Sequence, residues 1–219
     1  MERNPARVLG IFSHPDDAEI WAGGTLLAHR ARGDDTAICI LTHGDDSRAE
    51  EASRGADLLQ ARLVHLSFRD RGLGLAHSAA VEAAAGVLVQ ERPNIVITHW
   101  REDSHPDHRA AWEIAEAAIV LAEAENDLAA IISCDTYNGV GISGSLAPEY
   151  LVDVSEVWDQ KVAAIMAHTS QGPEHYCAMI ARQCALHGAA GGVTFAEGFV
   201  RVPLFGRARS ARPSLWDFI

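Results

Sequence analysis

Short apolar runs alternate with longer segments of helical periodicity along most of this chain. Five apolar runs predict buried strands at residues 7–12, 36–42, 63–68, 95–98 and 128–137. The segments between them predict helices at residues 20–32, 49–60, 79–90 and 110–125. Such alternation is typical of an α/β fold, here Rossmann-like, with a mostly parallel sheet and helices on both faces.

The pattern becomes less regular in the last third of the chain. It predicts a short strand at 150–154, helices at 157–167 and 173–186, and a last strand at 194–202. With no internal repeat, low-complexity segment or linker, we expect one domain over residues 1–219.

Two further segments show little periodicity. Residues 140–148 are rich in Gly and Ser, so they could form a lid or wall over a site, or be disordered. The tail at 206–219 ends in Trp216 and Phe218 and could dock on the body or on a second subunit, which leaves a homo-oligomer open.

Composition and charge exclude several classes of protein. The 219 residues are 48% hydrophobic and carry a formal net charge of −12, with no basic stripe to neutralise phosphates, so we expect no nucleic-acid partner. No signal peptide and no run of membrane-spanning length is evident. Cys39 and Cys134 lie in strand-like runs and are expected to be buried thiols, so a cytoplasmic location is the simplest expectation.

A cluster of polar residues, Ser-His-Pro-Asp-Asp-Ala-Glu, follows the first predicted strand at residues 13–19. Four of the seven are histidine or an acid, and the carboxyl ends of strands are where open α/β sheets bind ligands. The competing interpretation is a helix start at which Asp16 or Asp17 caps backbone N–H groups.

A second cluster, at residues 99–109, follows the predicted strand at 95–98 and again contains His-Pro-Asp. Two parallel strands would bring both clusters to one edge of the sheet. Together the clusters offer three metal ligands and two unligated acid/base groups: His14, Asp17 and His108, then Asp16 and His105. A set of two histidines and a carboxylate suits a catalytic zinc and also accepts Fe(II).

These clusters, residues 14–17 and 103–109, resemble the PIG-L/LmbE-like family of zinc-dependent N-deacetylases. Four further segments support the resemblance: Arg48-Ala49-Glu50-Glu51, Arg69-Asp70, Lys161 with His168-Thr169-Ser170-Gln171, and residues 195–199. The resemblance extends from about residue 7 to about residue 202. It implies a hydrolase with one zinc ion per chain and an N-acyl sugar as substrate, most often an N-acetylglucosamine conjugate.

The residue types indicate how such a site would work. Zinc held by His14, Asp17 and His108 would lower the pKa of water and polarise the substrate carbonyl. Asp16 is adjacent to a ligand but free, so it is the predicted general base.

His105, if protonated, would stabilise the oxyanion or protonate the leaving amine. Asp107 is predicted to hold His105 in the required tautomer and to raise its pKa. The resemblance implies the same roles at these positions.

The sequence indicates less about the residues that would contact the substrate. Arg48 and Asp70 are candidate contacts to a hydroxyl-rich substrate, with a surface ion pair as the alternative. Residues 71–77 lack the commoner Asp-Gly of the family, and Asp45 and Asp46 are expected to cap a helix or line a solvated loop. The alternative functions are an amidase for non-sugar N-acyl or thiol-conjugate substrates and a non-catalytic binding protein, which the complete set of acid/base groups disfavours.

Overall fold

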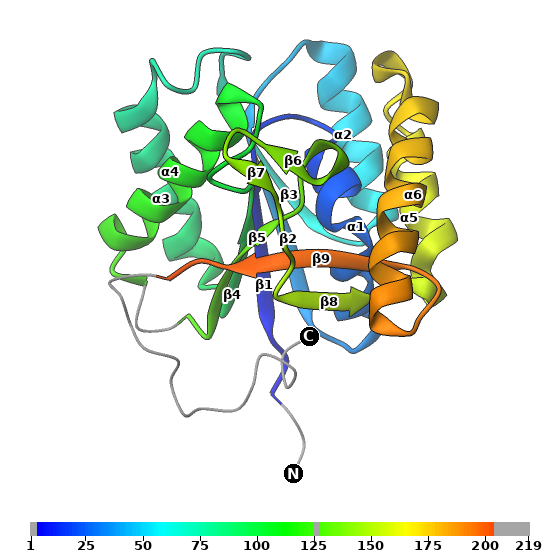
Figure 1. Cartoon of the computed structure of the whole chain (residues 1–219). Coiled ribbons are helices and arrows are strands. Elements are labelled where there is room, and N and C mark those ends of the chain that lie inside the picture. Colours follow the sequence, from blue (N-terminus) through cyan, green and yellow to red (C-terminus); the bar gives the residue numbers. More distant parts are fainter. Residues whose placement is uncertain (1–3, 125–127, 204–219) are drawn as a thin grey trace.

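The computed structural model describes residues 4–124 and 128–203, in which a seven-stranded sheet lies between two layers of helices (Figure 1). The strands run in the order β3-β2-β1-β4-β5-β9-β8. The first five are parallel: β1 (Arg7–Phe12), β2 (Asp35–Thr42), β3 (Arg62–Phe68), β4 (Ile95–Thr98) and β5 (Ala130–Cys134). Two antiparallel strands extend the sheet: β9 (Ala196–Arg201) and β8 (Tyr150–Asp153).

Helices cover both faces of the sheet, and each layer buries its own apolar cluster against it. One layer contains α1 (Asp17–Ala31), α2 (Asp46–Leu58), α5 (Trp158–Met166) and α6 (Pro173–Gly191). The other contains α3 (His77–Glu91) and α4 (Pro106–Leu121). The predicted fold class is therefore confirmed.

The sheet reverses its direction of growth between β1 and β4. From β1 the chain builds outward through β2 to β3, and then returns to place β4 on the other side of β1. In open α/β sheets the crevice at such a reversal is the usual ligand site. Both His-Pro-Asp clusters follow these two strands.

Three helices begin three or four residues earlier than their periodicity predicts. α1 begins at Asp17 rather than residue 20, and α4 at Pro106 rather than residue 110. Proline suits the first helical position, and acids in the first turn favour the helix dipole. α2 begins at Asp46, because the Asp45 side chain accepts the Arg48 N–H at 3.0 Å and caps it. Polar residues expected before the helices thus occupy rigid first turns.

Other boundaries shift for local reasons. α6 continues past the predicted end at residue 186 to Gly191, and it ends at Gly192, whose φ of 76° is the left-handed conformation that caps helices. α4 ends at Leu121, and the predicted end of that helix lies outside the described residues.

Segment 140–148 contains a two-stranded hairpin, which the sequence did not predict. After a 3₁₀ turn, η2 (Tyr137–Gly139), the strands β6 (Val140–Gly141) and β7 (Gly144–Ser145) pair antiparallel. The Ile142 N–H donates to the Glu102 carbonyl at 2.7 Å. The hairpin is thereby attached to the segment between β4 and α4.

The prediction of a single domain over residues 1–219 stays a prediction, and the expected docking of 206–219 lies outside the described residues. Among the helices of the described residues, none is long and apolar enough to cross a membrane. Cys39 and Cys134 are buried free thiols, as predicted.

A buried ion pair joins α5, in the layer that contains α1, to β9. Glu197 of β9 accepts hydrogen bonds from Lys161 of α5 and from the backbone N–H groups of Gly24 and Thr25, each of the latter at 2.8 Å. A Cβ at position 24 would lie 2.6 Å from Val154, so glycine here permits the close approach of α1. This close contact offsets the lower helix propensity of glycine relative to alanine.

Replacing Lys161 by Met should destabilise the protein by about 3–5 kcal/mol, because the buried Glu197 carboxylate would lose its cationic partner. Urea denaturation measures this change in the free energy of unfolding. Arg54→Met is the matched control, since Arg54 pairs with Glu50 on the surface at 4.0 Å and its loss should cost less than about 1 kcal/mol. Equal losses in the two variants would contradict the prediction.

Candidate metal centre

The two His-Pro-Asp clusters meet at the carboxyl edge of neighbouring strands. β1 pairs with β4, so the residues that follow Phe12 lie beside those that follow Thr98. The Ser13 N–H donates to His99 Nε2 at 3.1 Å, and the Ser13 hydroxyl donates to the Asp107 carbonyl at 2.9 Å. The predicted meeting of the clusters is therefore confirmed.

Asp17 lies at the centre of the three predicted metal ligands. Its Oδ2 accepts the His14 N–H at 2.7 Å and lies 3.2 Å from His14 Nδ1. Its Oδ1 lies 3.3 Å from His108 Nε2, and all three residues are buried. The fixed first turns of α1 and α4 thus bring His14, Asp17 and His108 into contact.

Asp103 orients the imidazole of His108 through Nδ1, the ring nitrogen that does not face Asp17. His108 Nδ1 donates to Asp103 Oδ2 at 3.0 Å, and the Thr136 hydroxyl donates to the same oxygen at 2.7 Å. This bond fixes the tautomer, leaving Nε2 of His108 buried and without a hydrogen-bond partner among the described residues. Metal-binding histidines in proteins are usually oriented by a carboxylate in this way.

This supporting layer is the part of the site that the sequence did not assign. Asp103 lies within the second cluster, and a carboxylate five residues before a candidate ligand was the available signal. Thr136 follows β5 and gave no signal. His99, which stacks on His108 with ring centroids 3.8 Å apart, was also unassigned.

The donor set fits a divalent cation. Among the described residues, three overlapping groups have ligand atoms within 4.8 Å of one another: His14/His105/His108, Asp17/His99/His108 and His14/Asp70/Asp107. Two of these groups contain two of the three predicted ligands, and the third contains His14. A buried, unpartnered imidazole nitrogen beside a carboxylate is the donor chemistry that zinc prefers.

Protons occupy these donors in the metal-free protein. Burial lowers the pKa of His14, but Asp17 and Asp107 outweigh it and raise that pKa to about 10. Burial also lowers the pKa of His108, but the Asp17 charge and the Asp103 hydrogen bond outweigh it and raise that pKa to about 9. Both imidazoles are therefore cations that partly balance the surrounding carboxylates.

Metal binding should consequently release about two protons and tighten by up to about a hundredfold per pH unit between pH 6.5 and 8.5. The sign follows because ligating histidines must be neutral, and raising the pH removes the competing protons. Calorimetry in buffers of different ionisation enthalpy measures the release. Zinc affinity that does not change over this range would contradict protonated ligand histidines.

Asp16 has the properties of an acid/base residue. It is buried, and its backbone adopts φ of 108°, an unusual conformation for a residue with a side chain. Burial and the neighbouring Asp17 charge raise its pKa to about 7. A carboxyl that titrates near neutral pH can both accept and return a proton.

Arg48 and Asp70 form an ion pair that lies beside the predicted ligands, and their contact with a substrate stays a prediction. Arg48 donates to the Pro15 carbonyl at 2.8 Å and approaches Asp16 Oδ2 at 3.5 Å and Asp70 Oδ2 at 3.4 Å. Asp70 Oδ1 lies 3.2 Å from His14 Nε2, while 36% of its side chain stays exposed. Asp70 therefore faces both the candidate ligand and solvent.

The predicted partnership of Asp107 with His105 is wrong in its detail. The Asp107 carboxylate lies 3.5 Å from His14 Nε2, and it is the Asp107 backbone N–H that donates to His105 Nδ1, at 3.2 Å. The pKa of His105 is lowered, not raised, by burial and by the charges of His108 and His14. His105 is thus a neutral imidazole whose proton sits on Nε2.

Two other segments of the resemblance, around Glu51 and around His168, contact each other. Glu51 accepts the Thr169 and Ser170 hydroxyls at 2.8 and 2.6 Å, which ties α2 to the turn after α5. His168 lies 3.4 Å from Glu19, and although burial opposes it, this contact raises the pKa of His168.

Removing the Thr136 hydroxyl with Thr136→Val should weaken metal binding about 10- to 100-fold, because Asp103 would hold His108 less firmly. Competition with a chromogenic chelator measures the affinity. Thr36→Val is the matched control, since the Thr36 hydroxyl on β2 is buried and has no hydrogen-bond partner in the described part of the chain. An affinity that stays unchanged in Thr136→Val would show that this second layer does not act on the metal.

A comparison with protein families finds one whose model matches residues 9–119, under the description PIG-L, GlcNAc-PI de-N-acetylase. This chain belongs to the PIG-L family. The match runs from β1 through most of α4 and so includes both clusters. The resemblance seen in the sequence is confirmed.

Individual proteins are similar to this chain over most of its length. A diacetylchitobiose deacetylase from Thermococcus kodakarensis is 32% identical over 90% of this chain and 83% of its own. A 1D-myo-inositol 2-acetamido-2-deoxy-alpha-D-glucopyranoside deacetylase from Corynebacterium glutamicum is 30% identical over 76% of this chain and 75% of its own. The crystal structure of a conserved protein from Thermus thermophilus superposes with a TM-score of 0.78 at 30% identity, covering 95% of this chain and 100% of the other.

Proposed function

We propose that this PIG-L protein is a metal-dependent hydrolase that removes the N-acetyl group from an N-acetylglucosamine-type sugar. The observation that carries the proposal is the buried contact of His14, Asp17 and His108 with Asp16 beside them. Relatives named as deacetylases of diacetylchitobiose and of a 2-acetamido-2-deoxyglucopyranoside support this substrate class.

His14, Asp17 and His108 would hold one zinc ion per chain, with Fe(II) as the alternative. Such an ion supplies a Lewis acid that lowers the pKa of water and polarises an amide carbonyl. The protein's part is to hold the three donors in fixed positions, which Asp103 does for His108.

Asp16 would act as the general base. Arg48 approaches its Oδ2, which leaves Oδ1 to take a proton from the attacking water. Because its pKa lies near 7, Asp16 can later return that proton toward the departing amine. Arg48 keeps the carboxylate oriented through its bond to the Pro15 carbonyl.

His105 would act on the substrate oxygen. The Asp107 N–H occupies Nδ1, so the Nε2–H is free to donate to the carbonyl oxygen as negative charge develops there. The ring lies close to both histidine ligands, with centroids 4.9 Å from His14 and 4.6 Å from His108. A neutral N–H donor in this position would stabilise the oxyanion, while the proton for the leaving amine would come from Asp16.

Arg48 and Asp70 would contact the sugar. The exposed part of Asp70 can accept a hydrogen bond from a ring hydroxyl, while Arg48 fixes its other oxygen. The position of Asp70 next to His14 would set the distance between that hydroxyl and the acetamido group.

The test is release of free amine from diacetylchitobiose and N-acetylglucosamine, against a simple N-acetyl amine without a sugar ring. The chelator-treated protein should be inactive, and added zinc or Fe(II) should restore activity on the sugars. Turnover of the simple amine at an equal rate would favour a general amidase. Full activity after chelation would rule out the metal-dependent reaction.

A further inference from the structure

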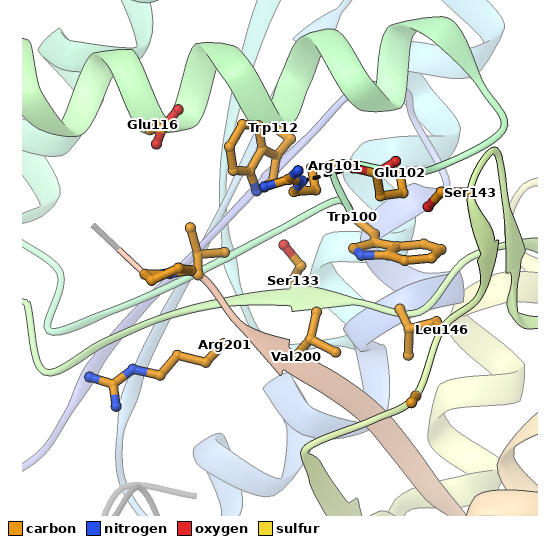
Figure 2. Close-up of a pocket in the computed structure, with 13 residues that line it drawn as sticks. Trp100, Arg101, Glu102, Trp112, Glu116, Ser133, Ser143, Leu146, Val200 and Arg201 are labelled. Carbon is orange, nitrogen blue, oxygen red and sulfur yellow. Dashed lines mark hydrogen bonds and ion pairs between the residues drawn. The ribbon is translucent and has the colours of Figure 1, made fainter. Parts of the chain in front are cut away.

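Apart from the candidate metal centre, the protein has a hollow on the face of the sheet that α4 only partly covers. Figure 2 shows the residues that line it. Its walls come from α4, the segment after β4, the hairpin, β5 and β9. The volume is about 460 Å³, within the range of small-molecule sites. No residue proposed for the metal centre or the sugar contacts lines it.

The floor of this hollow contains an unsatisfied hydroxyl. Ser133 of β5, paired with Val200 of β9, is 1% exposed, and its Oγ has no hydrogen-bond partner among the described residues. Figure 2 shows this hydroxyl directed toward the side of the hollow on which Trp112 and Arg101 lie. Because a buried hydroxyl without a partner is costly, a ligand with a polar group at this depth would gain a hydrogen bond.

Two indoles form the walls. Trp112 of α4 stands on one side with the Arg101 guanidinium 6.0 Å from its ring centroid. Trp100 stands on the other, and the hairpin backbone packs so closely on it that a Cβ at Gly141 would lie 2.4 Å from the indole. Flat aromatic faces held in this way suit a ring that can stack on them.

The charges around the hollow balance one another. Arg101 donates to Glu102 at 2.8 Å, and Glu116 and Arg201 contribute one further charge of each sign. The lining is therefore neutral overall, in contrast to the net charge of −12 of the whole chain. A neutral ligand with hydroxyl groups matches this combination of aromatic faces, paired charges and one buried hydroxyl.

We propose that this hollow is a second carbohydrate site, which binds a neutral pyranose ring between Trp100 and Trp112 with a ring hydroxyl on Ser133. Binding here requires neither an N-acyl group nor a metal ion. The site is therefore independent of the proposed deacetylation and can be tested without any turnover.

The test titrates cellotriose, a neutral sugar with no amide to hydrolyse, into the full chain. The full chain is used because Pro203 lies at the rim and sixteen residues follow it. We expect saturable binding by calorimetry, with a change in tryptophan fluorescence and the same affinity after chelator treatment. Adenosine, a flat ligand of another class, should bind at least tenfold more weakly.

Variants locate the binding. Trp112→Ala should weaken cellotriose binding about tenfold or more, whereas Leu121→Ala, an exposed apolar residue on the same helix, should leave it unchanged. Ser133→Ala should weaken binding several-fold without lowering stability, since its hydroxyl has no partner in the described structure to lose.

Three results would overturn the proposal. The first is that cellotriose does not bind to the full chain. This result would count against the proposal even if residues after Pro203 were what occupied the hollow. The others are equal binding by Trp112→Ala and equal binding of adenosine. Because none of these measurements involves hydrolysis, failure here and failure of the deacetylase proposal are distinguishable.

Discussion

Replacing His108 by Ala is expected to remove both the metal ion and the hydrolytic activity. His108 is fully buried, its Nδ1 is bound to Asp103, and its Nε2 has no hydrogen-bond partner within residues 4–124 and 128–203. Loss of this ligand would leave the ion with one histidine and one carboxylate of the proposed set. Loss of the Lewis acid should lower kcat/KM by about 10³-fold or more.

Elemental analysis and amine release measure the two effects, with circular dichroism to confirm that the variant is folded. His43→Ala is the control, because it removes an exposed imidazole at the same edge of the sheet. If His108→Ala kept a full complement of metal, the ion would have to be held by His14, Asp70 and Asp107, the group that excludes His108.

The second large effect separates proton transfer from metal binding within one dipeptide. Asp16→Asn should keep the metal but lower kcat by about 10²–10⁴-fold, because the amide cannot take a proton from water. Asparagine tolerates positive φ better than most residues, so the backbone at φ of 108° should survive the change. KM should change much less than kcat, since the interaction serves the transition state.

The pH profile distinguishes this role from a structural one. The wild type needs Asp16 deprotonated, so its kcat should fall as the pH drops below the pKa of that carboxyl. That pKa is about 7 without metal, and a bound cation would lower it. The Asn variant should lack this acidic limb. Wild-type kcat in the variant would move the base to Asp70 or Asp107, since Asp45 caps α2 and Asp46 is fully exposed.

Two strands that each bury one continuous apolar run were predictable to the residue, whereas β5 is shorter than the predicted 128–137. β1 and β4 match their predictions because a fully buried parallel strand has no polar position to blur its ends. The helix starts were predicted too late along the chain. Asp17 and Pro106 are polar or rigid residues, which are typical of loops but also favour a first helical turn.

The contacts that support the candidate ligands were not predictable. Asp103 and Thr136 are 33 residues apart, and only the pairing of β4 with β5 brings them together. The direction of the Asp107 carboxylate was likewise fixed by the helical turn that contains it, which points it toward His14. Sequence spacing identified the candidate ligands, whereas the sheet determined what supports them.

The buried ion pair at Glu197 has a practical consequence for chemistry on this protein. Lys161 is the only lysine in the chain, and it is 0% exposed. Apart from its terminal amine, the folded protein therefore offers almost no amino group to an acylating dye, whereas the unfolded chain offers one more. Such a dye would report unfolding directly, and it would detect the free amine of a deacetylated sugar with little background from the enzyme itself.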